Sequence, residues 1–420
     1  MGIFVDCHCH AFNFIDIPVY LTLTDKVKMG TVTKLKAATV ALLYAPKVIA
    51  SKNSLARKLA EHKEFIHFFE SSVERGLEAL LHDIRAYVVE DEGRPDNTEV
   101  LITPLVMDFD VLLREEKSGQ AGKEPSVKEQ YCRLERAINT SIVQDIPNSH
   151  ICPFVGFDLR KLRDADDDKL AGFKTFWEAS NTLGAGSIQD LESGKLLGIK
   201  LYPPIGFNPC PETLPPTYRA FYQWCCDNDI PLTAHCQTGS FAAGKEKHNI
   251  DRNTTPENWR RLLRHPELKS LRINFAHFGG ETGTDDMFDL LHTDEDSWTF
   301  ILIGLLKKYP NTFADIAAYD YSKSKHRKDL VRIFEEDAAG EYGPGFRLAD
   351  KLLWGSDVPM VISDKSYRSN HKPSGSSEYK YYIRSFIDTI KSSKVLTVAQ
   401  QEEIVRNLTE VNPKTFLRIQ

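Results

Sequence analysis

The sequence predicts an α/β protein, a (β/α)8 TIM barrel with a helical insertion after the first strand. Two observations lead to this fold class. Short apolar segments alternate along the chain with amphipathic ones, which is the pattern of a parallel sheet wound with helices. These apolar segments are nearly continuous, as strands buried on both faces require. A barrel of this kind can use all 420 residues as one domain, 1–420.

The predicted strands are eight short apolar runs. They cover residues 5–10, 100–108, 151–158, 198–201, 231–235, 272–277, 312–315 and 351–357. Between them, apolar residues recur three and four positions apart, the spacing that gives a helix one buried face. The predicted helices cover residues 126–142, 165–183 with a continuation at 188–191, 217–228, 255–264, 299–309 and 323–338.

The segment from about residue 15 to 98 is too long to be an ordinary connection between two barrel strands. Residues 55–89 have the apolar spacing of an amphipathic helix or helix pair, and the turn-rich residues 91–97 follow. We therefore expect a helical insertion at about 15–98 that covers one end of the barrel or forms an interface. Its histidines are interpreted as surface or packing residues: His62, His67 and His82.

Composition and charge restrict the classes of partner. The net charge of −6 argues against nucleic acid or an anionic membrane as the main partner. The most apolar run, residues 35–50, contains Lys36, Pro46 and Lys47 and is too short to cross a bilayer, and the N-terminus lacks a signal-peptide pattern. The eight cysteines lack the spacing of a disulfide scaffold. We therefore expect reduced thiols and a cytoplasmic protein.

The first predicted strand carries the sequence Asp6-Cys7-His8-Cys9-His10. Side chains alternate between the faces of a strand, so His8 and His10 should point one way and the two cysteines the other. Two imidazoles that face one point can hold a divalent metal if other ligands come from elsewhere in the chain. The same alternation means that one ion could not bind both the histidines and the cysteines.

Several predicted strands end, on their C-terminal side, in a residue that can bind a metal or transfer a proton. In a (β/α)8 barrel these strand ends meet at one mouth, where the active sites of this fold lie. Each such residue alone could instead be a core histidine, a lysine whose amine reaches solvent or a capping aspartate. The recurrence of the pattern favours one shared site. Its predicted members are His8, His10, Lys200, His235, His277 and Asp357.

The same segments, taken in order, resemble the amidohydrolase superfamily, and most closely its amidohydrolase-related (amidohydrolase 2) branch. The segments that carry the resemblance are HCH at 8–10, GIKLYPP at 198–204, the strands that run into His235 and His277, and LLWGSDVP at 352–359. Residues 397–417 also resemble the closing helices of that branch. The resemblance covers the barrel strands and the C-terminus but not the insertion.

This resemblance implies a metal centre. In the form with two metals, the two histidines of the first strand and Asp357 would bind the deeper ion, His235 and His277 a second one, and a carbamylated Lys200 would bridge them. In the form with one metal, His277 instead orients the attacking water. The KLYP sequence around Lys200 is similar to the segment that carries the bridging lysine in dihydroorotases, which favours two ions. Zinc is expected, with manganese as the alternative.

The expected activity is hydrolysis. A divalent ion lowers the pKa of bound water toward about 7 and polarises a carbonyl, and Asp357 could move the proton to the leaving group. The bond would be a C–N or C–O bond in an amide, cyclic amide, lactone or ester. The alternative, also found in that branch, is a metal-dependent non-oxidative decarboxylase of a small carboxylic acid. A third interpretation is a non-catalytic protein stapled by zinc.

The substrate is expected to be a small molecule. The main candidates to bind it, both near strand ends, are Tyr202 and Arg160, and further candidates are Arg252, Tyr319 and Arg368. A homodimer is expected because the resemblance implies the oligomeric state that is common in that family. The glycines of residues 279–283 are interpreted as a tight turn rather than a phosphate loop, because the spacing of a phosphate motif is missing.

Overall fold

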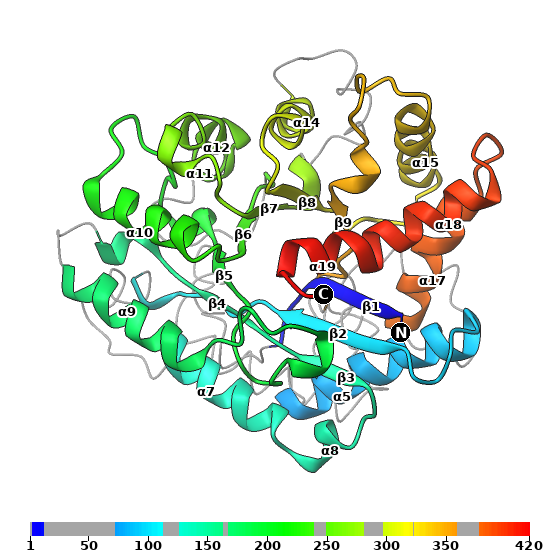
Figure 1. The fold of residues 1–420 in the computed structure, drawn as a ribbon, viewed down its shortest axis with the longest axis horizontal. Helices are drawn as coiled ribbons and strands as arrows, with labels where there is room; N and C mark the ends of the chain where they lie inside the picture. Colours follow the sequence, from blue (N-terminus) through cyan, green and yellow to red (C-terminus); the bar gives the residue numbers. More distant parts are fainter. Residues whose placement is uncertain are drawn as a thin grey trace, which may run out of the picture.

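Parallel strands form the inner layer of the molecule, and helices surround them (Figure 1). The structure is a computed structural model that describes residues 2–11, 72–111, 126–162, 167–238, 249–280, 297–321, 323–358 and 378–420. The strands are β1 (Ile3–Cys9), β2 (Glu99–Pro104), β3 (Ser149–Ile151), β4 (Phe154–Gly156), β5 (Gly198–Leu201), β6 (Leu232–His235), β7 (Ile273–Ala276), β8 (Thr312–Asp315) and β9 (Leu352–Leu353). The ladders between neighbouring strands are parallel.

The strands follow one another in chain order, in one sheet of β1 to β3 and another of β4 to β9. A parallel bridge between Leu105 and Phe154 joins the two sheets. At the other end, the Cys7 amide donates to the Trp354 carbonyl over 3.1 Å, and the Asp357 amide donates to the His8 carbonyl over 2.7 Å. The first strand therefore lies beside the segment that contains and follows the last one.

Helices separate most consecutive strands, as the apolar spacing predicts. They are α5 (Val73–Arg85) with the π-helical η2 (Ala86–Asp91), α7 (Val127–Ile138), α8 (Ser141–Gln144), α9 (Asp167–Ser180), α10 (Pro216–Asp227), α11 (Ile250–Thr254), α12 (Pro256–Leu262), α14 (Trp298–Lys308), α15 (Ser324–Ala338), α17 (Glu378–Lys391), α18 (Val398–Arg406), η10 (Asn407–Val411) and α19 (Asn412–Leu417). The predicted α/β class is confirmed. None of the helices in the described ranges is long and apolar enough to span a bilayer.

Three predicted elements differ from the structure. The predicted strand 151–158 is divided into β3 and β4 around Pro153, a residue that cannot donate to a ladder. The predicted strand 351–357 is reduced to β9, because the chain leaves the extended conformation and Asp357 has a φ of 57°. Of the predicted insertion, residues 72–98 form α5, η2 and the turn before β2, while residues 12–71, with His62 and His67, lie outside the described residues.

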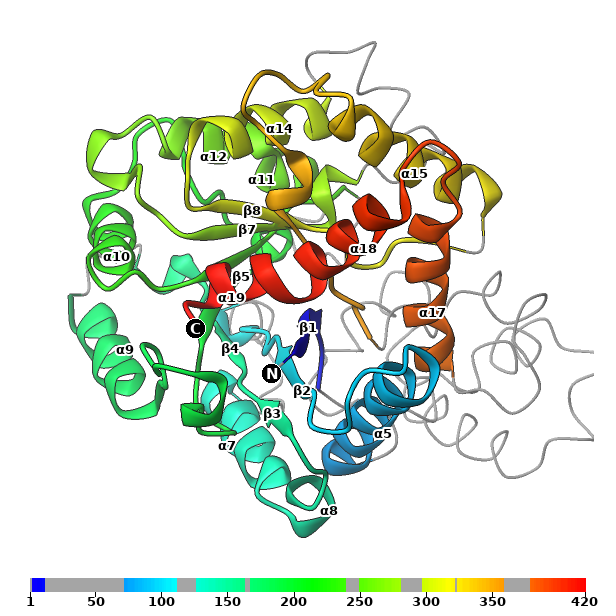
Figure 2. The ribbon, with the colours of Figure 1, turned by 45° about the vertical axis from the view of Figure 1, so that its right-hand side comes forward.

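Two hydrophobic clusters fill the fold. The larger, the outer cluster, packs the strands against the surrounding helices and includes Phe4 and Cys9 of β1. The smaller, the axial cluster, contains Ile3, Val5 and Cys7 of β1 together with residues of other strands and of α19. Figure 2 shows α18 and α19 crossing one end of the strands, and α19 contributes Phe416 and Leu417 to the axial cluster.

The predicted common face for Cys7 and Cys9 is wrong. Cys7 belongs to the axial cluster and Cys9 to the outer one, and the register of β1 against β2 shifts between Asp6 and Cys9. An irregularity of this kind interrupts the alternation of side chains along a strand. Val5 and Cys7 therefore pack in the axial cluster. His8 and His10 still turn to a common point.

Candidate metal centre

The ends of the strands bring the predicted histidines and Asp357 together. His8 and His10 come from the end of β1, His235 ends β6, His277 directly follows β7, and Asp357 follows β9. All five side chains are buried. Oδ1 of Asp357 lies 3.1 Å from Nε2 of His10 and 3.3 Å from Nε2 of His8. Residues that are hundreds of positions apart in the chain thus share one small volume.

The imidazole rings extend this cluster across the strand ends. The ring centroid of His277 lies 4.8 Å from that of His8 and 4.7 Å from that of His235. His8, His10 and Asp357 place three possible ligand atoms within 4.8 Å of one another, the arrangement that a metal ion requires. A second such group in the described residues consists of His8, His277 and Asp315, and neither group contains a cysteine. The cysteines of β1 are therefore packing residues in this arrangement.

Protein acceptors fix the orientation of three of the imidazoles. Nδ1 of His10 lies 3.1 Å from the Leu105 carbonyl, and Nδ1 of His277 lies 3.2 Å from the Ala317 carbonyl. A carbonyl oxygen only accepts, so Nδ1 must carry the proton in both rings. Nδ1 of His8 likewise faces a carboxylate, that of Asp315, at 2.9 Å. In each neutral ring Nε2 is then the nitrogen with the lone pair, as a metal ligand requires.

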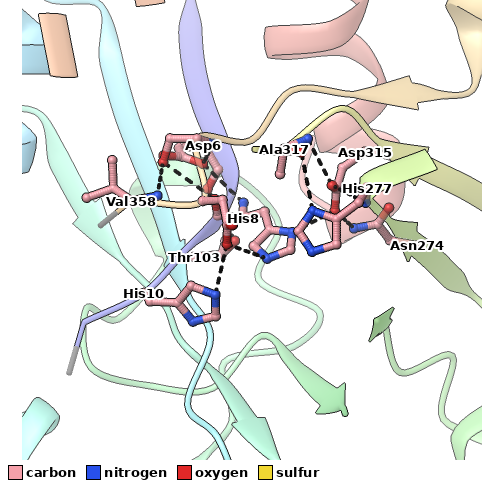
Figure 3. Close-up of polar contacts among 11 residues, drawn as sticks. Asp6, His8, His10, Thr103, Asn274, His277, Asp315, Ala317 and Val358 are labelled. Atoms are coloured by element: carbon pink, nitrogen blue, oxygen red, sulfur yellow. Dashed lines mark hydrogen bonds and ion pairs between the residues drawn. The ribbon is translucent and has the colours of Figure 1, made fainter. Parts of the chain in front are cut away.

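Asp315 is the residue of this site that the sequence analysis missed. It ends β8 and is fully buried, and Figure 3 shows it beside His8, His277 and Asn274. Its Oδ2 accepts from Nδ1 of His8 and from Nδ2 of Asn274, over 2.9 and 2.7 Å. Its Oδ1 accepts from the backbone amides of His277 and Ala317, over 2.9 and 3.1 Å. The signal was in the sequence, because 312–315 is also an apolar strand that ends in a ligand-type residue.

Lys200 lies inside the fold with an unsatisfied amine. The side chain is 1% exposed, and among the described residues Nζ has no hydrogen-bond partner. Desolvation lowers the pKa of Lys200 to about 8, although the charges of Asp315 and Asp357 oppose this shift. Thr233 on β6 is in register with Lys200, and Asn274 on β7 is in register with Thr233. Thr233 and Asn274 each also have a buried side-chain atom without a partner in the described part of the chain. Such groups are rare in native structures and call for a functional or solvent explanation.

The protonation states of most buried groups in the cluster suit a metal site, and His8 is the exception. Desolvation lowers the pKa values of His10 and His235, and that of His277 to about 4, which keeps these rings neutral at pH 7. Desolvation also opposes the charged form of His8, but the charge of Asp315 and the hydrogen bonds to Asp315 and Asp357 raise its pKa to about 9. The close contacts of its carboxylate with the His10 and His8 rings outweigh desolvation at Asp357 and hold its pKa well below the usual value.

The backbone of the site is strained at three residues that are not glycine. His277, Phe278 and Asp357 have φ values of 67°, 47° and 57°, in the left-handed region that costs a residue with a Cβ about 1 kcal/mol or more. Hydrogen bonds hold two of them there, from the His277 amide to Asp315 and from the Asp357 amide to the His8 carbonyl. Strained residues of this kind concentrate at functional sites.

A second buried carboxylate, that of Asp6, fastens β1 to the segment that carries Asp357. It accepts from the hydroxyls of Ser356 and Tyr379, both over 2.6 Å, and from the amides of Ser356 and His8, over 3.0 and 3.1 Å. Because Ser356 precedes Asp357, this network fixes the position of the Asp357 carboxylate relative to the histidines of β1. No separate sequence signal marks Asp6, because it is a single polar residue within a predicted strand.

The predicted substrate-binding residues occupy different environments. The Tyr202 ring packs against His235 with a centroid distance of 4.9 Å, which places it at the cluster. Arg160 is buried, and its Nη2 donates to Oδ2 of Asp158 over 2.6 Å. The hydroxyl of Tyr319 donates to the His326 carbonyl, and Arg252 lies on the short helix α11. Arg368 lies outside the described residues.

Comparison with known proteins gives a family match over part of the chain. Residues 185–375 match the model of the family described as Amidohydrolase. This segment contains the strands β5 to β9 with Lys200, His235, His277, Asp315 and Asp357. A search of curated proteins found no match.

Solved structures align with nearly the whole chain at low identity. They include a probable 2-pyrone-4,6-dicarboxylic acid hydrolase from Acinetobacter baumannii, with 12% identity over 99% of both chains and a TM-score of 0.46. A 5-carboxyvanillate decarboxylase from Novosphingobium aromaticivorans has 10% identity over 100% of this chain and 96% of that chain, with a TM-score of 0.48. A 2,6-dihydroxybenzoate decarboxylase from Rhizobium has 13% identity over 100% and 99%, with a TM-score of 0.45. The family match covers less than half of the chain, and over residues 185–375 this chain is similar to the family described as Amidohydrolase.

Proposed function

We propose that this enzyme is a metal-dependent hydrolase that cleaves a C–N or C–O bond of a small amide, cyclic amide, lactone or ester. One observation carries the proposal. His8, His10 and His277 each have Nδ1 at a protein acceptor, so Nε2 is the ring nitrogen left to face the cluster, and His8 and His10 turn it toward the Asp357 carboxylate. Neutral imidazole and carboxylate are the ligands that zinc prefers.

The contact between His10 and Asp357 is more favourable with a divalent ion between the two side chains than without one. Nε2 of His10 lies 3.1 Å from Oδ1 of Asp357, yet with Nδ1 committed to a carbonyl a neutral His10 turns a lone pair toward a negative oxygen. Two acceptors at that distance repel each other unless a cation or proton lies between them. A divalent ion would satisfy both, held by His8, His10 and Asp357, with His235 and His277 as further ligands.

The chain's own residues then have distinct roles. A bound divalent ion supplies Lewis acidity, which polarises a carbonyl and makes water a better nucleophile. Asp357 is ionised and lies at the centre of the cluster, so it can accept the proton of the attacking water and pass it to the leaving group. His277, if it is not a ligand, orients that water through Nε2. Tyr202, packed against His235, is placed to contact the substrate.

Lys200 supports the form with two metals. Carbamylation joins a neutral amine to carbon dioxide and releases a proton, so it requires an amine that loses its proton easily. The pKa of Lys200 is lowered to about 8, and Nζ has no hydrogen-bond partner among the described residues. We propose that Lys200, once carbamylated, would help to hold two ions. Mass measurement under mild conditions should show a labile carbon dioxide adduct that is lost in Lys200→Met.

Metal analysis and a matched pair of histidine variants test the proposal. His10→Gln removes a buried member of the cluster, whereas His82→Gln changes an exposed histidine of α5. Protein grown with zinc should retain the metal as wild type and as His82→Gln, and lose most of it as His10→Gln. Equal metal content in both variants would contradict a metal site at this position.

A substrate panel and Asp357→Asn separate the activities. Lactones, amides, esters and aromatic carboxylates should be tested with the metal-loaded enzyme, and we expect hydrolysis of one of the first three classes. Release of carbon dioxide from a carboxylate would instead assign the decarboxylase alternative. Asp357→Asn should abolish turnover and keep most of the metal. If Asp357→Asn changes no activity, the metal is structural and the enzyme hypothesis for this site fails.

A further inference from the structure

We infer that Asp315 is a positioning residue for two members of the metal centre, because its carboxylate selects the ring nitrogen that His8 presents and holds the backbone of His277. The inference rests on the proposed metal-binding function. It concerns a residue that lies behind the ligands and that the family match does not assign a role.

The hydrogen-bond donors that surround the Asp315 carboxylate indicate this role. Three of the hydrogen-bond partners of the Asp315 carboxylate are two backbone amides and the NH2 group of Asn274, which can only donate. The fourth, Nδ1 of His8, lies 2.9 Å from Oδ2 and must also donate, because an ionised carboxylate has only acceptors. The proton of a neutral His8 is therefore on Nδ1, and Nε2 carries the lone pair on the side of Asp357.

Asp315 acts on His277 through the main chain. Its Oδ1 accepts from the His277 amide over 2.9 Å and from the Ala317 amide over 3.1 Å. His277 has a φ of 67°, a conformation that needs external support in a residue with a side chain. The Ala317 carbonyl in turn accepts from Nδ1 of His277. One carboxylate thus orders both the strained backbone of His277 and the loop that orients its ring.

The three oriented histidines differ in a way that makes Asp315 testable. His10 and His277 donate from Nδ1 to backbone carbonyls, which no substitution removes. His8 instead donates from Nδ1 to a side chain, that of Asp315. In Asp315→Asn the new side-chain amide has one acceptor oxygen and one donor NH2 group, but it faces the same four donors that the carboxylate accepted from. If the oxygen stays with the two backbone amides, the NH2 group faces Nδ1 of His8 and favours the tautomer with the proton on Nε2.

The experiment compares zinc binding and ring tautomer in two matched variants. Asp337 is a second buried carboxylate, 3% exposed, that accepts from the amides of Leu348 and Ala349 on η8 (Leu348–Asp350), away from the cluster. Zinc affinity should fall about 10–100-fold in Asp315→Asn and stay unchanged in Asp337→Asn, as expected for the loss of a carboxylate behind a histidine ligand. Both variants lose a buried charged acceptor, so a general loss of stability would affect both.

Nitrogen-15 spectra of the histidine rings provide a readout that does not depend on activity or on either variant. In the zinc-loaded wild type, His8 should show a protonated Nδ1 and a metal-bound Nε2. A metal-bound Nδ1 of His8, or equal zinc affinity in wild type and Asp315→Asn, would overturn the inference while leaving the metal site intact. If the wild type itself binds no zinc, the proposed function fails first, so the two failures can be told apart.

Discussion

Gly355 provides the sharpest test of how the site is assembled. A Cβ added at this residue would lie 2.5 Å from Cβ of His8 and 3.1 Å from its backbone nitrogen. Ordinary contact begins at 3.4 Å, so Gly355→Ala forces β1 and the segment 354–357 about 0.9 Å apart. The hydrogen bond from the Asp357 amide to the His8 carbonyl, 2.7 Å long, lies next to this contact and would be stretched.

The size of the effect follows from this displacement. Overpacking a well-packed core costs about 1–3 kcal/mol, and a misplacement of about 1 Å in an active site lowers its rate on the order of 100-fold. Gly355→Ala should therefore lose about 1–3 kcal/mol of unfolding free energy and most of its zinc affinity. Urea unfolding of the metal-free protein and competition with a chromophoric zinc chelator measure the two quantities separately.

Gly304 offers the matched control. It is exposed on α14, and a Cβ there would meet nothing within 4 Å. Because glycine is a poor helix former, Gly304→Ala should raise stability by about 0.5–1 kcal/mol and leave zinc binding unchanged. The same chemical change is thus expected to have opposite signs at the two positions. Wild-type zinc affinity in Gly355→Ala would refute the idea that close contact between His8 and Gly355 sets the geometry of the site.

Three further predictions follow from strain, burial and protonation. Ala318 is exposed with a φ of 60°, so Ala318→Gly should raise the unfolding free energy by about 1 kcal/mol, whereas Ala171→Gly on the exposed face of α9 should lower it by a similar amount; urea unfolding checks both signs. The pKa of Lys200 is about 8 when folded and 10.5 by reference, so Lys200→Met should stabilise the metal-free protein by about 3 kcal/mol at pH 7. The unfolded chain binds more protons between pH 8 and 10.5, so wild-type stability rises there, and a gain in Lys200→Met that fails to shrink across this window would contradict the burial argument. The pKa of His8 is about 9, so zinc must displace its proton at lower pH; affinity should rise up to about 100-fold from pH 7 to pH 9, and a flat profile in chelator competition would exclude a charged His8.

Periodicity in the sequence predicted the elements that bury regular faces. β5 and β8 begin and end at the predicted residues, 198–201 and 312–315, because each is a short apolar run bounded by turns or helices. Helix α17 was not predicted, although its buried residues Tyr382, Phe386 and Ile390 are spaced by four. Its tyrosines and lysines made the segment look polar, and only the packing of Tyr382 and Phe386 against Trp354 shows the buried face.

A residue of the site could be predicted from the sequence when it lies at the end of an apolar strand. His235 is the last residue of an apolar strand and His277 directly follows one, and Asp315, the last residue of β8, could have been found in the same way. What the sequence could not show is the shift of register in β1, since strict alternation would give Cys7 and Cys9 one face. It also could not show which partner each imidazole nitrogen has, because Leu105, Ala317 and Asp315 meet the rings only in the folded chain.

Three unfavourable features coincide at the cluster: a buried amine without a partner among the described residues, left-handed backbone at His277 and Asp357, and the His10 lone pair opposite the Asp357 oxygen. A core selected for stability alone would avoid each of them, since apolar replacements of similar volume cost less than unpaired buried polar groups. A divalent ion relieves the third directly, and carbamylation would remove the charge that makes the first unfavourable. Two of the three features that destabilise the metal-free chain are therefore ones that metal loading with carbamylation corrects, and zinc should stabilise the wild type far more than it stabilises Lys200→Met.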